Sequence, residues 1–226
     1  MIKNNLVFDL GFHNGIDTEF YLKKGFDVVA IEANPKLVKE GLKKFKSEIK
    51  SGKLTILNKV VSDKIENMNF YIHKMKSDWS SCFKVIAESD GSISNRISVE
   101  SININELFHE FGVPYYMKVD IEGCDSIVAK QLFVQEKPKF VSFEISRKDY
   151  FEIFSWLYVS GYTKFQLRNQ MNNPEYSSGE FAKFLPENKW ISYDELLTRY
   201  IKYKDLKIID NVELGLGWID VHANME

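Results

Sequence analysis

The stretch Asp9-Leu10-Gly11-Phe12-His13-Asn14-Gly15 decides the fold of this chain of 226 residues. It ends a short apolar run, residues 6–10, that is typical of a buried strand, and it leads into a segment of helical character at 18–24. Its two glycines let the backbone bend tightly and approach a ligand closely. The stretch therefore predicts a strand that turns sharply into a helix, with a binding position at the turn.

The alternation of strand and helix continues along the chain. It predicts a doubly wound, mostly parallel α/β sheet with helices on both faces. One helix is expected to begin at Asn105 as its N-cap, and a final edge strand is expected at 214–221. The other predicted strands are 27–31, 54–61, 68–73, 96–102, 115–120, 140–144 and 162–167, and the other helices are 35–45, 125–132, 149–159 and 192–203.

Length and composition favour one globular domain over residues 1–226. Two polar segments interrupt the rhythm: residues 74–96, which we interpret as a loop or lid over a site, and residues 168–191, which we interpret as an insertion. Aromatic side chains near the insertion could stack on a sugar or simply pack.

Charge and cysteine content exclude several classes of protein. The 30 basic and 32 acidic residues give a net charge of −2, which supplies no basic field for nucleic acid. The two cysteines, Cys82 and Cys124, have no CxxC partner, so no metal site of that kind is expected. No signal peptide or membrane-spanning apolar run is found, and we expect a cytoplasmic protein.

Acidic side chains follow one predicted strand after another. Ligands of open α/β sheets bind at the carboxyl ends of the strands, so these acids should gather around one site. A single acid at a strand end is usually a solvated loop residue or a helix cap, but the joint pattern points to a ligand. The acids are Asp9, Glu32, Asp63, Asp120, Glu122 and Glu144.

The first turn separates two kinds of nucleotide ligand. A dinucleotide requires G-x-G-x-x-G, but His13 and Ile16 stand where the second and third glycines would be, so an NAD-dependent oxidoreductase is the weaker alternative. S-adenosylmethionine has no phosphate. Asp9 could receive its ammonium group, Glu32 both ribose hydroxyls, and Asp63 the adenine amino group.

Four motifs resemble the FkbM family of S-adenosylmethionine-dependent methyltransferases over roughly residues 6–165. They are the D-x-G-x-x-x-G turn, Glu32-Ala33-Asn34-Pro35, Val61-Ser62-Asp63 and Lys118-Val119-Asp120-Ile121-Glu122-Gly123. The resemblance implies a class I methyltransferase fold, with seven strands of which the last is antiparallel, and O-methylation of a sugar, glycan or secondary metabolite. The expected cofactor contacts are Asp9, Gly11, His13, Asn14, Gly15, Glu32, Ala33, Asn34, Ser62, Asp63 and Asp120.

Transfer to an alcohol needs a base beside the methyl group. Asp120 or Glu122 is expected as the base or as the group that orients the acceptor, with Glu144 beside them; a divalent ion held by these acids is the weaker idea. Phe12 departs from the family pattern, and its bulk would lie beside the cofactor. A non-catalytic module that binds S-adenosylmethionine is the main alternative. The acceptor and the oligomeric state stay open.

Overall fold

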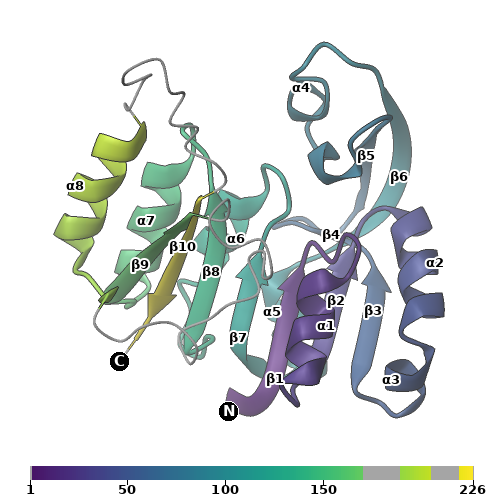
Figure 1. The fold of residues 1–226 in the computed structure, drawn as a ribbon, viewed down its shortest axis with the longest axis horizontal. Helices are drawn as coiled ribbons and strands as arrows, with labels where there is room; N and C mark the ends of the chain where they lie inside the picture. Colours follow the sequence, from purple (N-terminus) through teal and green to yellow (C-terminus); the bar gives the residue numbers. More distant parts are fainter. Residues whose placement is uncertain (1, 170–188, 205–218, 226) are drawn as a thin grey trace.

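A seven-stranded sheet forms the centre of the computed structural model (Figure 1), which describes residues 2–169, 189–204 and 219–225. The strand order is β3-β2-β1-β7-β8-β10-β9, and β10 runs antiparallel to both of its neighbours while the other neighbouring pairs are parallel. The expected α/β fold is thereby confirmed. The strands are β1 (Ile2–Leu10), β2 (Asp27–Glu32), β3 (Leu54–Asn58), β7 (Val113–Val119), β8 (Phe140–Ile145), β9 (Lys164–Asn169) and β10 (Ile219–Asn224).

Helices cover both faces of the sheet because the strands are apolar on both sides. One face packs against α1 (Ile16–Lys23), α2 (Pro35–Lys44) and α3 (Lys46–Lys50) through a cluster that includes Tyr21, Val28 and Tyr116. The opposite face packs Phe8 and Val141 against the remaining long helices. These are α5 (Ile104–Phe111), α6 (Asp125–Gln131), α7 (Tyr150–Val159) and α8 (Tyr193–Lys204).

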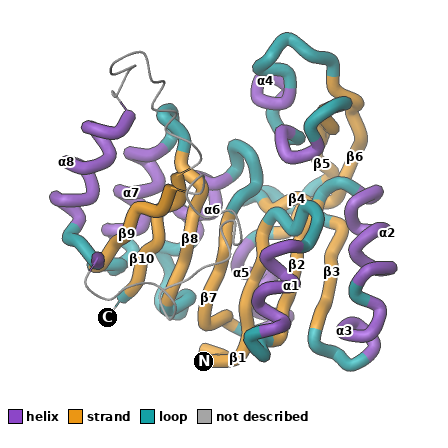
Figure 2. The backbone as a smooth tube through the Cα atoms, viewed as in Figure 1, coloured by secondary structure: helices purple, strands orange, loops and turns teal. Residues whose placement is uncertain are grey.

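A smaller sheet stands above the carboxyl ends of the large one (Figure 2). Its order is β4-β6-β5, from β4 (Val60–Val61), β5 (Asn67–His73) and β6 (Ser94–Ile102). Residues 74–93 join β5 to β6 and contain a 3₁₀ turn, η1 (Ser77–Trp79), and a short helix, α4 (Lys84–Ala87). We call these residues segment 74–93; they make up most of the loop predicted at 74–96.

Three sequence predictions are wrong in detail. The strand expected at 54–61 is broken after Asn58, and its end pairs with β6 instead. The cap of α5 is Asn103, whose side chain accepts from the backbone N–H of Glu106 in a capping box, rather than Asn105. The final strand is not at an edge, because β10 inserts between β8 and β9.

Two further expectations concern the insertion at 168–191 and the absence of membrane-spanning segments. Most of the insertion predicted at 168–191 lies outside the described residues; its first two residues close β9, and Ile191 bridges to Phe165. None of the helices that the structure describes combines the length and the apolar character needed to cross a bilayer.

Candidate functional site

The turn after β1 is held against the ends of β2 and β7. The backbone N–H groups of Gly11 and Phe12 both donate to the carbonyl of Ile31, at 3.0 Å each. Gly11 has a φ of +91°, and a Cβ placed there would lie 1.8 Å from the carbonyl oxygen of Asp120. Only glycine lets the two strand ends come this close.

Phe12 turns away from the site. Its ring is 3% exposed and meets Phe45 edge to face, with ring centroids 6.0 Å apart. A Cβ on Gly15 or Gly41 would lie within 2.7 Å of the same ring, so both glycines make room for it. The residue that departs from the family pattern therefore fills the core on the α2 face and leaves the turn's other side open.

Glu32 ends β2 with its carboxylate fixed by backbone donors. Oε2 accepts from the N–H of His13 at 2.8 Å, and Oε1 accepts from the N–H of Asn34 at 2.7 Å. Burial raises the pKa of Glu32, and these two hydrogen bonds oppose that rise. Each oxygen keeps a second lone pair, so the carboxylate can still accept two hydroxyl groups.

Lys118 lies beneath the turn and forms ion pairs with three carboxylates. Its Nζ is 3.2 Å from Asp17, 3.4 Å from Asp120 and 3.5 Å from Asp9, and it donates to the carbonyl of Gly11 at 3.1 Å. Burial disfavours its charge, but the carboxylates outweigh burial and hold the pKa of Lys118 well above its usual range. This buried charge cluster ties β1, α1 and β7 together.

Asp9 belongs to that network and does not line the cavity described below. Thr18 donates to its Oδ2 at 2.6 Å, and the residue is fully buried. Burial raises the pKa of Asp9 to about 6, although Lys118 opposes the rise. In this structure Asp9 supports the turn from below.

Three acids converge at the ends of β7 and β8. One carboxylate oxygen from each of Asp120, Glu122 and Glu144 lies within 4.8 Å of the others. Asp120 and Glu144 share a hydrogen bond, and Asp220 stands opposite Glu144 across the β8–β10 pair. Oxygen ligands in this arrangement could hold a divalent cation, or they could act on a substrate.

The acids titrate differently because their surroundings differ. Burial, with Asp120 next, raises the pKa of Glu122 to about 8. Burial and the same neighbour raise the pKa of Glu144 well above its usual range. Burial acts the same way on Asp120, but Lys118 and the hydrogen bond with Glu144 together outweigh it and lower the pKa of Asp120. Near neutral pH the cluster thus holds an ionised Asp120 beside protonated neighbours.

Glu122 is set apart by its backbone. It has a φ of +49°, in the left-handed region that residues other than glycine rarely adopt. The turn is fixed by Asp125, whose carboxylate accepts from the N–H groups of Ile121 and Gly123 at 3.1 and 2.9 Å. A strained residue held by its surroundings is often found at a functional site.

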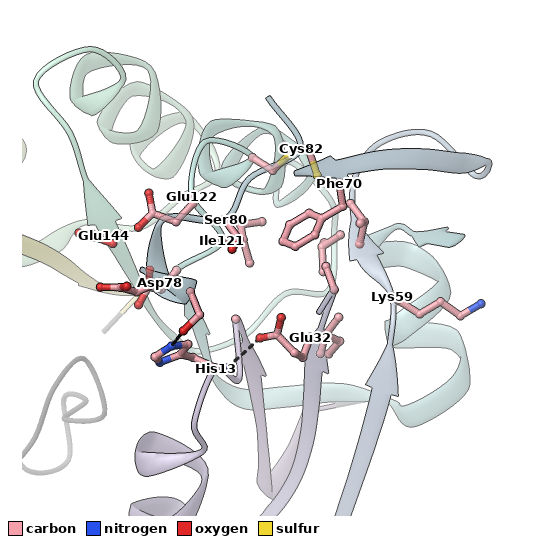
Figure 3. Close-up of a pocket in the computed structure, with 18 of the residues that line it drawn as sticks. His13, Glu32, Lys59, Phe70, Asp78, Ser80, Cys82, Ile121, Glu122 and Glu144 are labelled. Atoms are coloured by element: carbon pink, nitrogen blue, oxygen red, sulfur yellow. Dashed lines mark hydrogen bonds between the residues drawn. The ribbon is translucent and has the colours of Figure 1, made fainter. Parts of the chain in front are cut away.

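A cavity of about 310 Å³ connects these features (Figure 3). That volume lies within the range of small-molecule sites, roughly 300–1,000 Å³. In Figure 3, Glu122 and Glu144 lie together on one side, and Glu32 projects toward the cavity with His13 beside it. Among the predicted site residues, those that line the cavity are Gly11, His13, Glu32, Ala33, Asp120, Glu122 and Glu144.

The other predicted residues lie behind the wall or outside it. Asn34 caps α2, and Asn14 accepts from the N–H of Ile16. Gly15 packs on Phe12, Ser62 is buried, and the exposed Asp63 does not line the cavity.

Several lining residues were missed by the sequence reasoning. Asp220 reaches the cavity from β10, and Phe70 from β5. Segment 74–93 contributes Ser77, whose Oγ lies 2.9 Å from Nε2 of His13, and also Asp78 and Ser80. The polar stretch at 74–96, interpreted as a loop or lid over a site, was the sequence signal for this segment; nothing local marks Phe70 or Asp220, because they reach the cavity through pairing of distant strands.

Comparison with solved structures shows the class of fold. The structure is similar to the methyltransferase FkbM from Methylobacillus flagellatus KT, with a TM-score of 0.52 at 13% identity, over 78% of this chain and 43% of that one. This chain thus spans less than half the length of that protein. A precorrin-6y C5,15-methyltransferase from Geobacter metallireducens GS-15 gives a TM-score of 0.41 at 10% identity, over 74% of this chain and 66% of that one. Sheet order and the first likeness define a class I methyltransferase fold.

The sequence identifies the family itself. Residues 9–167 match the methyltransferase FkbM domain, and the chain therefore belongs to the FkbM methyltransferase family. No curated protein matches the sequence. The family expected from the four motifs is confirmed.

Proposed function

We propose that this protein transfers the methyl group of S-adenosylmethionine to a hydroxyl oxygen of a small molecule or glycan. One observation carries the proposal: a single cavity at the carboxyl ends of the strands holds both the oriented carboxylate of Glu32 and the acids Asp120, Glu122 and Glu144. When bound, the cofactor supplies a methyl group already activated by its sulfonium.

The lining residues suit the parts of that cofactor. The open lone pairs of Glu32 would accept the two ribose hydroxyls, as the acid after the second strand does in nucleotide-binding folds. Val60, Val61 and Phe70 give the cavity an apolar portion suited to an adenine ring. The wall at Gly11 carries no side chain and leaves space for the methionine portion.

The acids would handle the acceptor. Asp120, ionised and held by Lys118, would orient the hydroxyl, and Glu122 would take its proton as general base. With a pKa of about 8, Glu122 is mostly protonated near pH 7 while the site is empty, and the sulfonium cation of the bound cofactor would favour the ionised form that can accept the proton. Glu144 would keep Asp120 in place through their shared hydrogen bond.

Ligand binding tests the cofactor half of the proposal. S-adenosylhomocysteine should stabilise the protein against heat, by about 2.7 kcal/mol at roughly 100 times Kd, whereas NAD should not. Glu32→Gln should weaken this stabilisation, and Glu40→Gln, an exposed acid on α2, should leave it unchanged. Stabilisation by NAD alone would favour the oxidoreductase alternative.

Transfer assays test the catalytic half. Glu122→Gln should still bind S-adenosylhomocysteine but should lose transfer to hydroxyl acceptors by about 10²–10⁴-fold, the usual contribution of a general base. Cofactor binding without transfer to any acceptor in the wild-type protein would favour the non-catalytic binding module.

A further inference from the structure

The two cysteines of the chain meet in the wall of the cavity. Cys82 lies between η1 and α4 in segment 74–93, and Cys124 directly precedes α6. Both line the cavity, and their thiol groups are hydrogen-bonded to each other. Figure 3 shows Cys82 close to Phe70, at the end of the cavity away from Glu144. Two free thiols that are distant in sequence are thus brought together at the point where segment 74–93 meets the main sheet.

The backbones on either side of the thiols are packed together. Oγ of Ser81 donates to the carbonyl of Glu122 at 2.6 Å. A Cβ on Gly123 would lie 2.3 Å from the Ile86 side chain, 3.3 Å from Phe83 and 3.6 Å from Ser81 Oγ. A disulfide needs Cα atoms about 4.4–6.8 Å apart, and the close packing of the flanking chains brings the two cysteine backbones toward each other.

The two thiols differ in reactivity. Cys82 is partly exposed, and the hydrogen bond from Cys124 lowers its pKa. Cys124 is 1% exposed, and the same hydrogen bond, followed by burial, raises its pKa. Since the thiolate is the nucleophile, Cys82 would react first and Cys124 second.

We propose that Cys82 and Cys124 form a reversible disulfide that links segment 74–93 to the loop before α6, in the wall of the cavity. The oxidant is a small-molecule disulfide such as oxidised glutathione. The Cys82 thiolate attacks one glutathione sulfur and releases one glutathione thiolate; Cys124, after losing its proton, then attacks Sγ of Cys82 and releases the second. Both cysteines are oxidised, and one disulfide molecule is reduced to two thiols.

The consequence for ligand exchange rests on the proposed function. Cys82 shares the apolar portion of the cavity with Val60 and Phe70, where the adenine ring is proposed to bind. A covalent link at this point would prevent segment 74–93 from lifting, so bound cofactor or product would leave more slowly. Oxidation would thereby slow turnover without changing any of the acids.

The test uses the full chain in reduced and oxidised glutathione, with free thiols then blocked and peptides mapped by mass spectrometry. The wild-type protein should yield a peptide pair joined through Cys82 and Cys124 within one chain. Cys124→Ser should instead accumulate glutathione on Cys82, and Cys82→Ser should leave Cys124 unmodified. Glutathione retained on Cys82 of the wild type, or links only between chains, would overturn the proposal.

Hydrogen exchange tests the fastening without any ligand. Residues 74–93 should exchange more slowly in the oxidised than in the reduced wild type, and equally in both states of Cys82→Ser; unchanged exchange in the cross-linked protein would refute it. Release of S-adenosylhomocysteine should slow roughly tenfold on oxidation, about 1.4 kcal/mol in the barrier. If the reduced protein binds no S-adenosylhomocysteine, the proposed function fails, while mapping and exchange still decide the disulfide.

Discussion

Gly11 and Gly25 have nearly the same backbone conformation but different surroundings. Their φ angles are +91° and +89°, but a Cβ meets nothing within 4 Å at Gly25 and lies 1.8 Å from the Asp120 carbonyl at Gly11. Substitution by alanine should cost both about 1–3 kcal/mol of backbone strain, and Gly11→Ala a further ~1–3 kcal/mol for overlap. Urea denaturation of both variants measures the difference; equal losses would show that the strand ends separate freely.

Lys118 is expected to matter more for stability than any exposed lysine. Lys118→Met leaves Asp9, Asp17 and Asp120 without their cation and should cost about 3–5 kcal/mol at pH 7.5. Lys23→Met, which removes an exposed pair with Glu19, should cost about 1 kcal/mol or less.

The stability lost in Lys118→Met should be smaller toward pH 5, because the carboxylates that no longer have a cation beside them can then take up protons. Denaturation at the two pH values checks this, with Lys23→Met as the control. A loss of the same size at both would mean that packing of the lysine stem, rather than its charge, stabilises the turn.

The acids could be found from the sequence, and their partners could not. Asp120 and Glu144 follow apolar runs, and parallel strands bring such positions to one edge. Lys118 precedes Asp120 within the recognised motif, but its burial among carboxylates depends on α1 folding back over the sheet. The orientation of Phe12 likewise depends on Gly41, a residue in α2.

Segment 74–93 is joined to the main sheet by a hydrogen bond that one substitution removes. Ser81→Ala removes the donor to the Glu122 carbonyl and should lower the free energy of local opening by about 1 kcal/mol. Amide hydrogens of residues 81–86 and 121–124 should then exchange about fivefold faster. Ser92→Ala removes bonds to His73 and Asp90, which lie within or beside the same segment, and should leave 121–124 unchanged. Hydrogen exchange distinguishes the two variants. Equal effects of both at residues 121–124 would refute a specific role of the Ser81 hydrogen bond in holding the segment to the main sheet.

For helices and strands, the local sequence pattern predicts that an element forms better than it predicts where the element lies in the fold. The first strand, its turn and the helix beginning at Pro35 were expected because periodicity and caps are local signals. The break after Asn58 was missed, since the residues on both sides are apolar and only pairing with β6 separates them. The position of β10 was missed because apolar strands do not encode their neighbours.

At the scale of the molecule, the raised pKa values make stability depend on pH. The folded protein holds protons on Glu122 up to about pH 8 and on Asp125 up to about pH 7, above the usual carboxyl range. Folding therefore binds protons, and the free energy of unfolding should fall as pH rises from about 6.5 to 8, by up to about 1.4 kcal/mol per pH unit for each proton. His222, with its pKa lowered from 6.5 to about 3, acts in the opposite direction between those values, and therefore mainly below this window.

Glu122→Gln isolates one of these protons. Its gain in stability over the wild type should be larger at pH 8 than at pH 6.5, because the wild type alone must release a proton there. Urea denaturation at several pH values checks the trend. A difference that does not change with pH would show that Glu122 is already ionised in the folded state.

Because β10 lies between β8 and β9, the central sheet can be completed only after β10 has been synthesised. While the ribosome is still making the chain up to residue 218, β8 and β9 lack the strand that joins them in the described sheet. Their open edges can pair with other nascent chains, and the polar rung of Glu144 and Arg168 then stands without Asp220 between them. Among the strands of the described sheet, the one translated last is thus the one that closes it, and it brings Asp220 to Glu144 in the same step.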